Sequence, residues 1–184
     1  MRCGFVVCVV LMAAGSARAE TPQAERLGRV IAEATLTDYR GSSVSLADVK
    51  DKPIVVLAFL GAECPLAKLA ATKLNTLAKE FEPRGVAILG INSNRQDSLA
   101  DLAAQAKAQE VAFRLLKDSG NKLADAAGAV RTPEIVVLDQ QRAIRYIGRI
   151  DDQDGIGYRR DAAKRQDLKI AIEELLANKP VSVA

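Results

Sequence analysis

The sequence lacks histidine and tryptophan altogether, and it has only three cysteines in 184 residues. Without histidine the chain can form no Cys-His zinc site, no histidine-ligated copper or haem centre, and no Ser-His or Cys-His catalytic pair. We therefore expect neither a metal nor a cofactor. The 26 Lys and Arg residues nearly balance the 23 Asp and Glu residues, so the composition does not indicate a nucleic-acid partner.

The first residues have the pattern of an export signal. Arg2 supplies a positive charge, an apolar run too short to span a bilayer follows, and Ala17-Arg18-Ala19 is a small-x-small cleavage site. We predict a signal peptide over residues 1–19, with cleavage before Glu20. The mature protein is then expected to be exported, periplasmic or otherwise extracytoplasmic, with no stable membrane insertion. A retained N-terminal anchor is the alternative interpretation.

Cleavage would leave Cys64 as the only cysteine, because Cys3 and Cys8 lie inside the predicted signal. A single cysteine excludes an intramolecular disulfide. Cys64 follows an apolar run over residues 54–60 and precedes Pro65, a favoured first residue of a helix. The unpaired N–H groups and positive dipole end of a helix N-terminus favour the thiolate, the reactive form of cysteine. The alternative is an inert cysteine that packs as a small apolar side chain.

Strand and helix patterns alternate along the rest of the chain. We predict a flexible mature N-terminus over residues 20–32 and one domain over residues 33–178, beginning with a β-hairpin at residues 33–46. Strands and helices are then predicted in this order: strand 54–60, helix 65–81, strand 86–92, helix 98–109, strand 113–116, helix 121–127, strands 134–138 and 144–149, a polar loop over 151–165, and a last helix from about 168 to 176. This order predicts an α/β fold, with a central mixed sheet flanked by helices.

Four segments, in this order, resemble the thioredoxin fold and specifically the exported redoxins of the AhpC/TSA-like group. They are Asp38-Tyr39-Arg40-Gly41, the strand that runs into Cys64-Pro65, Leu115-Leu116-Lys117-Asp118, and Arg131-Thr132-Pro133 before the strand at 134–138. The resemblance implies a thioredoxin-like fold with an N-terminal β-hairpin. It also implies a cis Pro133 that faces Cys64, where the backbone of Thr132 can pair with a bound thiol substrate. An ordinary trans proline at a strand entrance is the alternative.

Three positions depart from the family pattern. Thioredoxin-like reductases have a second, resolving cysteine where this chain has Ala67. Typical peroxiredoxins have a threonine or serine at the position of Gly61 and a proline at that of Leu57, and both groups assist the attack on peroxide. The chain therefore cannot cycle through an internal disulfide, and its peroxidase machinery is incomplete.

The resemblance implies a single-cysteine thiol oxidoreductase, or peroxiredoxin-like antioxidant protein, with Cys64 as its catalytic residue. The thiolate would attack a disulfide or be oxidised by a peroxide, and an external thiol or a thioredoxin-type reductant would resolve the adduct. One alternative is a scaffold that grips extended peptides beside Pro133 with little turnover. Another is a structural partner in extracytoplasmic redox or cytochrome assembly.

The residues expected to support Cys64 are its sequence neighbours and the segment before the third central strand. They are Glu63, Pro65, Lys68, Arg131, Thr132 and Pro133. The carboxylate of Glu63 opposes thiolate formation, whereas Lys68, one turn along the helix, favours it. Arg131 either holds a developing negative charge near the sulfur or is a solvated loop arginine.

Two polar segments follow predicted strands. Residues 92–97 form a loop beyond a strand's C-terminal end, and such loops border the active edge of open α/β folds, so this loop is a candidate border of the Cys64 cleft. Asp151-Asp152-Gln153-Asp154-Gly155 has some features of a calcium loop but lacks the EF-hand spacing and its closing glutamate. A turn with Asx hydrogen bonds is the favoured interpretation of the second segment.

Overall fold

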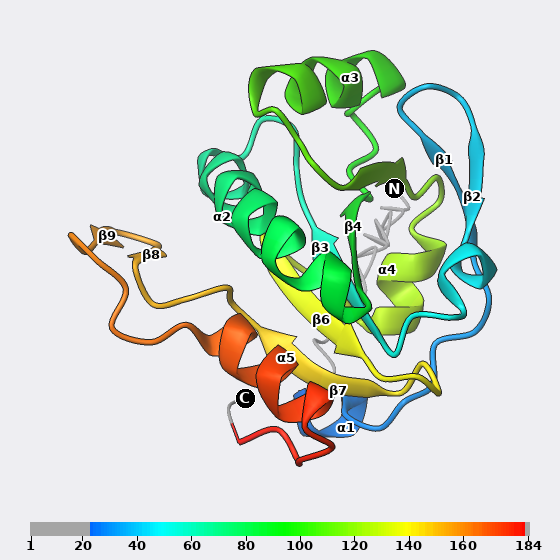
Figure 1. The fold of residues 1–184 in the computed structure, drawn as a ribbon. Helices are drawn as coiled ribbons and strands as arrows, with labels where there is room; N and C mark the ends of the chain where they lie inside the picture. The colour runs from blue at the N-terminus through cyan, green and yellow to red at the C-terminus, as the bar shows by residue number, and fades with distance from the viewer. Residues whose placement is uncertain (1–22, 183–184) are drawn as a thin grey trace, which may run out of the picture.

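The computed structural model describes residues 23–182, so the predicted signal peptide lies outside the described residues. Seven strands form one mixed sheet in the order β2-β1-β5-β4-β3-β6-β7 (Figure 1). Their bounds are Thr35–Asp38 for β1, Ser43–Ser45 for β2, Ile54–Phe59 for β3, Val86–Asn92 for β4, Arg114–Lys117 for β5, Glu134–Leu138 for β6 and Ile144–Gly148 for β7. The predicted mixed sheet is thus confirmed.

The three central strands β3, β4 and β5 run parallel, whereas β6 is antiparallel to β3 and β7 is antiparallel to β6. The predicted hairpin β1–β2 does not stand apart, because β1 pairs antiparallel with β5 and extends the sheet. Every residue of β3 is buried. A strand buried on both faces needs apolar side chains throughout, and this explains the unbroken apolar run in the sequence.

Helices cover both faces of the sheet. The helices are α2 (Pro65–Phe81), α3 (Leu99–Ala108), α4 (Lys122–Ala127) and α5 (Asp167–Leu176). Val56 of β3 packs in one buried apolar cluster with residues of α2, α3 and α5, whereas its neighbours Val55 and Leu57 pack in a second cluster with residues of α4. Successive strand residues point to opposite faces, so β3 supplies side chains to both cores. No helix within residues 23–182 is long and apolar enough to cross a membrane.

Residues 23–32 differ from the predicted flexible N-terminus. They contain a short helix, α1 (Gln23–Arg26), and Arg26 is only 4% exposed. Its guanidinium pairs with Glu134 at 2.9 Å and donates to the carbonyl of Ala127, also at 2.9 Å. Ile31 is buried in the same region. The partner carboxylate is 108 residues away in the sequence, so local patterns could not reveal why this segment is ordered.

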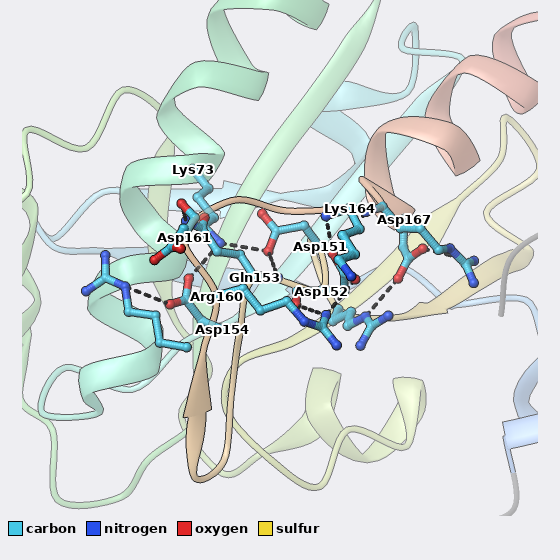
Figure 2. A network of polar contacts seen from close by, with 12 residues as sticks. Lys73, Asp151, Asp152, Gln153, Asp154, Arg160, Asp161, Lys164 and Asp167 are labelled. Atoms are coloured by element: carbon cyan, nitrogen blue, oxygen red, sulfur yellow. Dashed lines mark hydrogen bonds and ion pairs between the residues drawn. The ribbon is translucent and has the colours of Figure 1, made fainter.

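The segment between β7 and α5 also differs from the predicted loop. It contains a small two-stranded hairpin of β8 (Asp154–Gly155) and β9 (Tyr158–Arg159). The Nζ atom of Lys73, in the middle of α2, donates to Asp151 and Asp154 at 2.7 Å each (Figure 2). These two contacts attach the base of the hairpin to the helix. We call residues 151–166 the insert.

Asp152 organises the rest of the insert. Its carboxylate accepts the backbone N–H groups of Lys164 at 2.7 Å and Arg165 at 2.9 Å, and it pairs with Arg160 at 2.6 Å (Figure 2). These contacts hold the pKa of Asp152 below its ordinary value, the Arg165 N–H contributing most. Asp151 accepts the N–H of Gln153 at 3.0 Å, an Asx turn. The turn interpretation of this segment is therefore confirmed.

Candidate functional site

Cys64 lies at the junction between the central strand and the longest helix. After β3 ends at Phe59, residues 60–63 turn the chain, and Cys64 is the N-cap residue of α2 with extended backbone angles (φ −72°, ψ 118°). Pro65 occupies the first turn of the helix, as predicted. The thiol is free and half-buried, and it is the only free cysteine that the described part of the chain contains. This position gives the sulfur both a helix N-terminus and access to solvent.

The segment before β6 faces the cysteine. Strands β3 and β6 are neighbours, and Phe59 lies opposite Glu134, so the end of one strand meets the beginning of the other. The Thr132–Pro133 peptide bond is cis, as the resemblance implied. The Cys64 thiol donates to the carbonyl oxygen of Thr132, with 3.5 Å between Sγ and O. The structure therefore brings together the cysteine and the cis-proline segment.

Gly61 leaves room for two polar side chains beside Cys64. A Cβ atom at this position would lie 2.6 Å from Nδ2 of Asn94 and 3.3 Å from Oγ1 of Thr132. The same point is 3.5 Å from Cβ of Cys64. Because 2.6 Å is shorter than an ordinary contact, a threonine or serine here would displace the Asn94 amide. With glycine at position 61 instead of the threonine or serine of typical peroxiredoxins, the Asn94 amide and the Thr132 hydroxyl lie next to Cys64.

A buried carboxylate holds the turn that precedes Cys64. Asp97, 5% exposed, accepts the backbone N–H of Ala62 at 2.9 Å and the side-chain amides of Asn92 at 2.7 Å and Asn94 at 3.1 Å. Burial alone would raise the pKa of Asp97, but these hydrogen bonds and the charge of Lys117 outweigh it and hold that pKa below its ordinary value. The 92–97 loop, expected only to border the cleft, is thus tied directly to the cysteine turn.

Lys117 supports the same loop from β5. Its ammonium group donates to Oδ1 of Asn92 at 2.9 Å and to the backbone carbonyl of Asn94. Burial lowers the pKa of Lys117, while the charges of Asp97, Asp118 and Asp101 act in the opposite direction. Sequence reasoning missed Asn94, Asp97 and Lys117 as individual residues. The available signal was their position at or just after the C-terminal ends of adjacent parallel strands, which lie at one edge of the sheet.

The charged residues expected around Cys64 lie on the surface. Glu63 and Lys68 form an ion pair of 3.5 Å, with side chains 87% and 47% exposed. The lysine thus faces the carboxylate that was expected to oppose it, and their opposing charges partly cancel. Arg131 is exposed, next to Thr132. Ala67, at the position of the resolving cysteine in related reductases, is fully buried in the first turn of α2.

A small groove runs beside Pro133 between α2 and the insert. Its volume is about 50 Å³, and its walls include Leu66 and Leu69 of α2, Pro133, Arg149 and Asp154. The leucines and the proline provide an apolar lining, and Lys73 and Asp154, which form an ion pair of 2.7 Å, also line the groove.

Comparisons with known proteins agree with this arrangement. The model of the AhpC/TSA family matches residues 27–147, which contain Cys64 and Pro133 but not the insert. Chloroplastic peroxiredoxin Q of Triticum aestivum is 30% identical over 127 residues, which cover 65% of this chain and 57% of the relative. The chain therefore spans little more than half the length of that relative.

Solved structures of other proteins have a similar fold. A hypothetical protein from Sinorhizobium meliloti is 31% identical, with a TM-score of 0.76 over 86% of this chain and 88% of the other. A secreted disulfide oxidoreductase of Mycobacterium tuberculosis is 19% identical, with a TM-score of 0.58 over 84% and 98% of the two chains, and it shares the fold. The architecture is thioredoxin-like, as predicted.

Proposed function

Because this chain belongs to the AhpC/TSA family, we propose that it is a thiol oxidoreductase that acts through Cys64 alone. The observation that carries the proposal is the placement of Cys64, half-buried at the N-cap of α2 with its sulfur 3.5 Å from the carbonyl before the cis-proline. A helix N-terminus stabilises negative charge on sulfur, and an adjacent extended backbone can pair with a bound substrate.

The reaction begins when the Cys64 thiolate attacks a disulfide. One sulfur–sulfur bond forms to Cys64, and the other half of the disulfide leaves as a thiolate. Ala67 offers no second sulfur, so an external thiol or a thioredoxin-type reductant attacks the mixed disulfide and releases Cys64. A peroxide is the alternative oxidant: the sulfur takes one oxygen as sulfenic acid, and an alcohol or water leaves.

The site of action is proposed to be outside the cytoplasm. The support is the sequence of residues 1–19, with the positive charge of Arg2, a short apolar run and a small-x-small site. Intact-mass measurement of protein recovered from the native host tests this directly. A mature chain that begins at Glu20 is expected, and a retained Met1 would contradict it.

The thiol chemistry is tested in the full chain with Cys3→Ser and Cys8→Ser, which leaves Cys64 as the only cysteine. Under native conditions this protein should release thionitrobenzoate from dithionitrobenzoate stoichiometrically and form one mixed disulfide. Added Cys64→Ser should abolish the reaction. If Cys64 reacts only after denaturation, the oxidoreductase proposal is wrong and the peptide-binding scaffold replaces it, with the groove beside Pro133 as its site.

A further inference from the structure

The first described residues, 23–31, lie along β7, the last strand of the sheet (Figure 1). We call them the N-terminal arm. The side-chain amide of Gln23 donates to the carbonyl of Ile147 in β7 at 2.8 Å. Three backbone hydrogen bonds of 2.8–2.9 Å join the arm to residues 142–144. The arm is therefore fixed to the sheet by contacts that do not involve the cysteine site.

One side chain of the arm reaches the loop that carries Thr132. We call residues 128–133, between α4 and β6, the Thr132 loop. The Nε atom of Arg26 donates to the carbonyl of Ala127, the last residue of α4, and its Nη1 atom pairs with Glu134, the first residue of β6, both at 2.9 Å. The second carboxylate oxygen of Glu134 accepts the backbone N–H of Val130 at 3.0 Å. One guanidinium thus joins the two ends of the loop, and its partner carboxylate holds the middle.

The Thr132 loop has little packing that could hold it without these contacts. Val130 is 51% exposed, and Arg131 is exposed as well. The side chains of Arg26 and Glu134, in contrast, are only 5% and 1% exposed. The position of the loop therefore depends on this buried ion pair more than on apolar contacts.

Gly128 shows that the loop is built around the guanidinium. A Cβ atom at this position would lie 2.9 Å from Nε and 3.1 Å from Cδ of Arg26, so any larger residue would push the arginine away. The same residue has φ +69°, a backbone conformation that glycine adopts without strain. Glycine therefore allows both the turn after α4 and the close approach of Arg26.

The group that the loop places is the backbone of Thr132, whose carbonyl oxygen accepts the Cys64 thiol at 3.5 Å. We propose that Arg26 is a positioning residue of the cysteine site, and that it holds this backbone ready for the main chain of an extended peptide disulfide. The inference rests on the proposed function, in which the backbone beside Cys64 pairs with a bound substrate. Arg26 lies just outside the matched family region, which begins at residue 27.

The step that this positioning supports is the first thiol–disulfide exchange. The Cys64 thiolate attacks a sulfur of the peptide disulfide, a new sulfur–sulfur bond forms as the old one breaks, and the other half leaves as a thiolate. A backbone that is already in place makes the binding of an extended peptide more favourable, because less conformational freedom is lost. A small disulfide that contacts only the sulfur does not use this backbone. The arm therefore favours peptide disulfides over small ones.

Two disulfides with the same leaving group separate binding from reactivity. One is the pentapeptide acetyl-Ala-Ala-Cys-Ala-Ala amide with thionitrobenzoate on its sulfur, and the other is mercaptoethanol with the same group. Attack by Cys64 releases thionitrobenzoate from both, because this aromatic thiolate is the better leaving group. The full chain with Cys3→Ser and Cys8→Ser is the parent. We expect its rate to saturate with the peptide and to stay linear with the mercaptoethanol derivative.

Arg26→Gln should raise the half-saturating concentration of the peptide about fivefold, as for the loss of one neutral hydrogen bond. The maximal rate and the rate with the mercaptoethanol derivative should change by less than about twofold. Arg26→Lys keeps a cation opposite Glu134 and should recover part of the peptide binding. Arg29→Gln is the matched control, because Arg29 is an exposed arginine of the same arm that donates to the carbonyl of Ala126 at 3.3 Å. It should leave both reactions unchanged.

A second variant covers the loss of folding that an unpaired buried carboxylate can cause. Arg26→Gln combined with Glu134→Gln removes both charges, and it should raise the half-saturating concentration in the same way. Circular dichroism and urea unfolding establish which of the two proteins is folded and is used for the comparison.

Four results would overturn the inference. A parent with equal, linear rates for both disulfides would show that no peptide binds before reaction. An unchanged half-saturating concentration in the folded variant would mean that the loop does not depend on Arg26. Equal slowing with both disulfides would place the effect on the reactivity of Cys64, and an equal effect of Arg29→Gln would assign it to the charge of the arm. A parent that reacts with neither disulfide contradicts the proposed function itself, so the two failures are distinguishable.

Discussion

Two regions contact helix α2: the surroundings of Cys64 at its N-terminus and the insert, which binds Lys73 near its middle. The polar side chains of these two regions differ in how many partners they have within the chain. In the insert, Asp151, Asp152 and Asp154 all accept donors from the chain itself (Figure 2). Around Cys64, the Glu63–Lys68 ion pair is largely exposed at 3.5 Å, and the thiol has one contact, of 3.5 Å, to the carbonyl of Thr132. The insert contains eight charged side chains and no cysteine, whereas the cysteine region contains the free thiol.

This difference separates the groups that hold the structure from those that are available for a ligand. A carboxylate that already accepts two or three donors is fixed in place and has little capacity for a substrate. Lys73 and the three aspartates therefore act as scaffold, and they keep the wall of the Pro133 groove in position. Beside Cys64, Asp97 is fixed in the same way by three donors, whereas the exposed Glu63 and Lys68 and the thiol itself are available to a bound molecule.

Ala67→Cys should have the largest effect, because it gives the cysteine region a second sulfur at a position where the chain has none. Residues 64 and 67 stand three apart at the start of α2, so their side chains are neighbours. We expect a disulfide between Cys64 and the new cysteine, and dithiol reductase activity in an insulin-reduction assay where the parent has none. The full chain with Cys3→Ser and Cys8→Ser is the background.

Two controls accompany this variant. Ala67 is fully buried, so Ala67→Ser measures the effect of a similar polar group without a sulfur. Adding Cys64→Ser to Ala67→Cys should remove the disulfide and the activity together. A double-cysteine protein that stays reduced in oxidising glutathione would show that the two sulfurs cannot reach bonding geometry, against the placement of Cys64 described above.

Lys73→Met tests the scaffold side of the comparison. The side chains of Lys73, Asp151 and Asp154 are 24%, 12% and 11% exposed, so the variant leaves two mostly buried carboxylates without their shared cation. We expect the free energy of unfolding to fall by about 1–3 kcal/mol, with faster amide hydrogen exchange confined to the insert.

Lys169→Met is the matched control for Lys73→Met. It breaks the pair with Glu80, in which both side chains are 36% exposed, and its effect should stay below about 1 kcal/mol. Equal losses for the two lysines, measured by urea unfolding, would mean that the double bridge at the insert is not a special anchor.

The parts of the fold that the sequence could predict are those with strong local signals. The apolar run at 54–60 and the proline at position 65 placed β3 and the start of α2 to within a residue. The order of ordinary strands and helices followed from the same kind of pattern. The β8–β9 hairpin was missed because it has only two residues per strand, and its anchor, Lys73, belongs to a distant helix.

The site divides in the same way. The N-cap position of Cys64 and the cis bond before Pro133 were predictable because each residue stands in a short motif with a recognisable neighbour. Asn94 and Asp97 were not, since their importance depends on the space above Gly61 and on the N–H of Ala62, which only the folded chain brings together. Residues that support the cysteine through space carry little signal in a single sequence.

Asp97→Asn tests the buried support of the cysteine turn through pH. The folded-state pKa of Asp97 is below 3.8, its ordinary value, so the unfolded chain binds the proton more readily. The ionised carboxylate therefore contributes its full stability above pH 3.8, and this contribution is lost as the pH falls towards the folded-state pKa. The difference in unfolding free energy between parent and Asp97→Asn should shrink on acidification from pH 6 to about pH 3. A difference that is constant over that interval would contradict the assigned pKa shift.

Glu63→Gln should give the smallest effect, because this side chain is 87% exposed and its charge acts through solvent. Removing the carboxylate takes away a repulsion felt by a thiolate and by an anionic reagent, and it frees Lys68 from its partner. We expect dithionitrobenzoate to react up to about fivefold faster at low salt, with the gain disappearing at high salt, where surface charges are screened.

A second variant and a second reagent serve as controls. Lys68→Gln should slow the reaction with dithionitrobenzoate, and the rate with uncharged dithiodipyridine should change less in either variant. If both reagents respond equally and salt has no influence, Glu63 acts on Cys64 through local structure instead of charge, and the description of this pair as a loosely held surface contact is wrong.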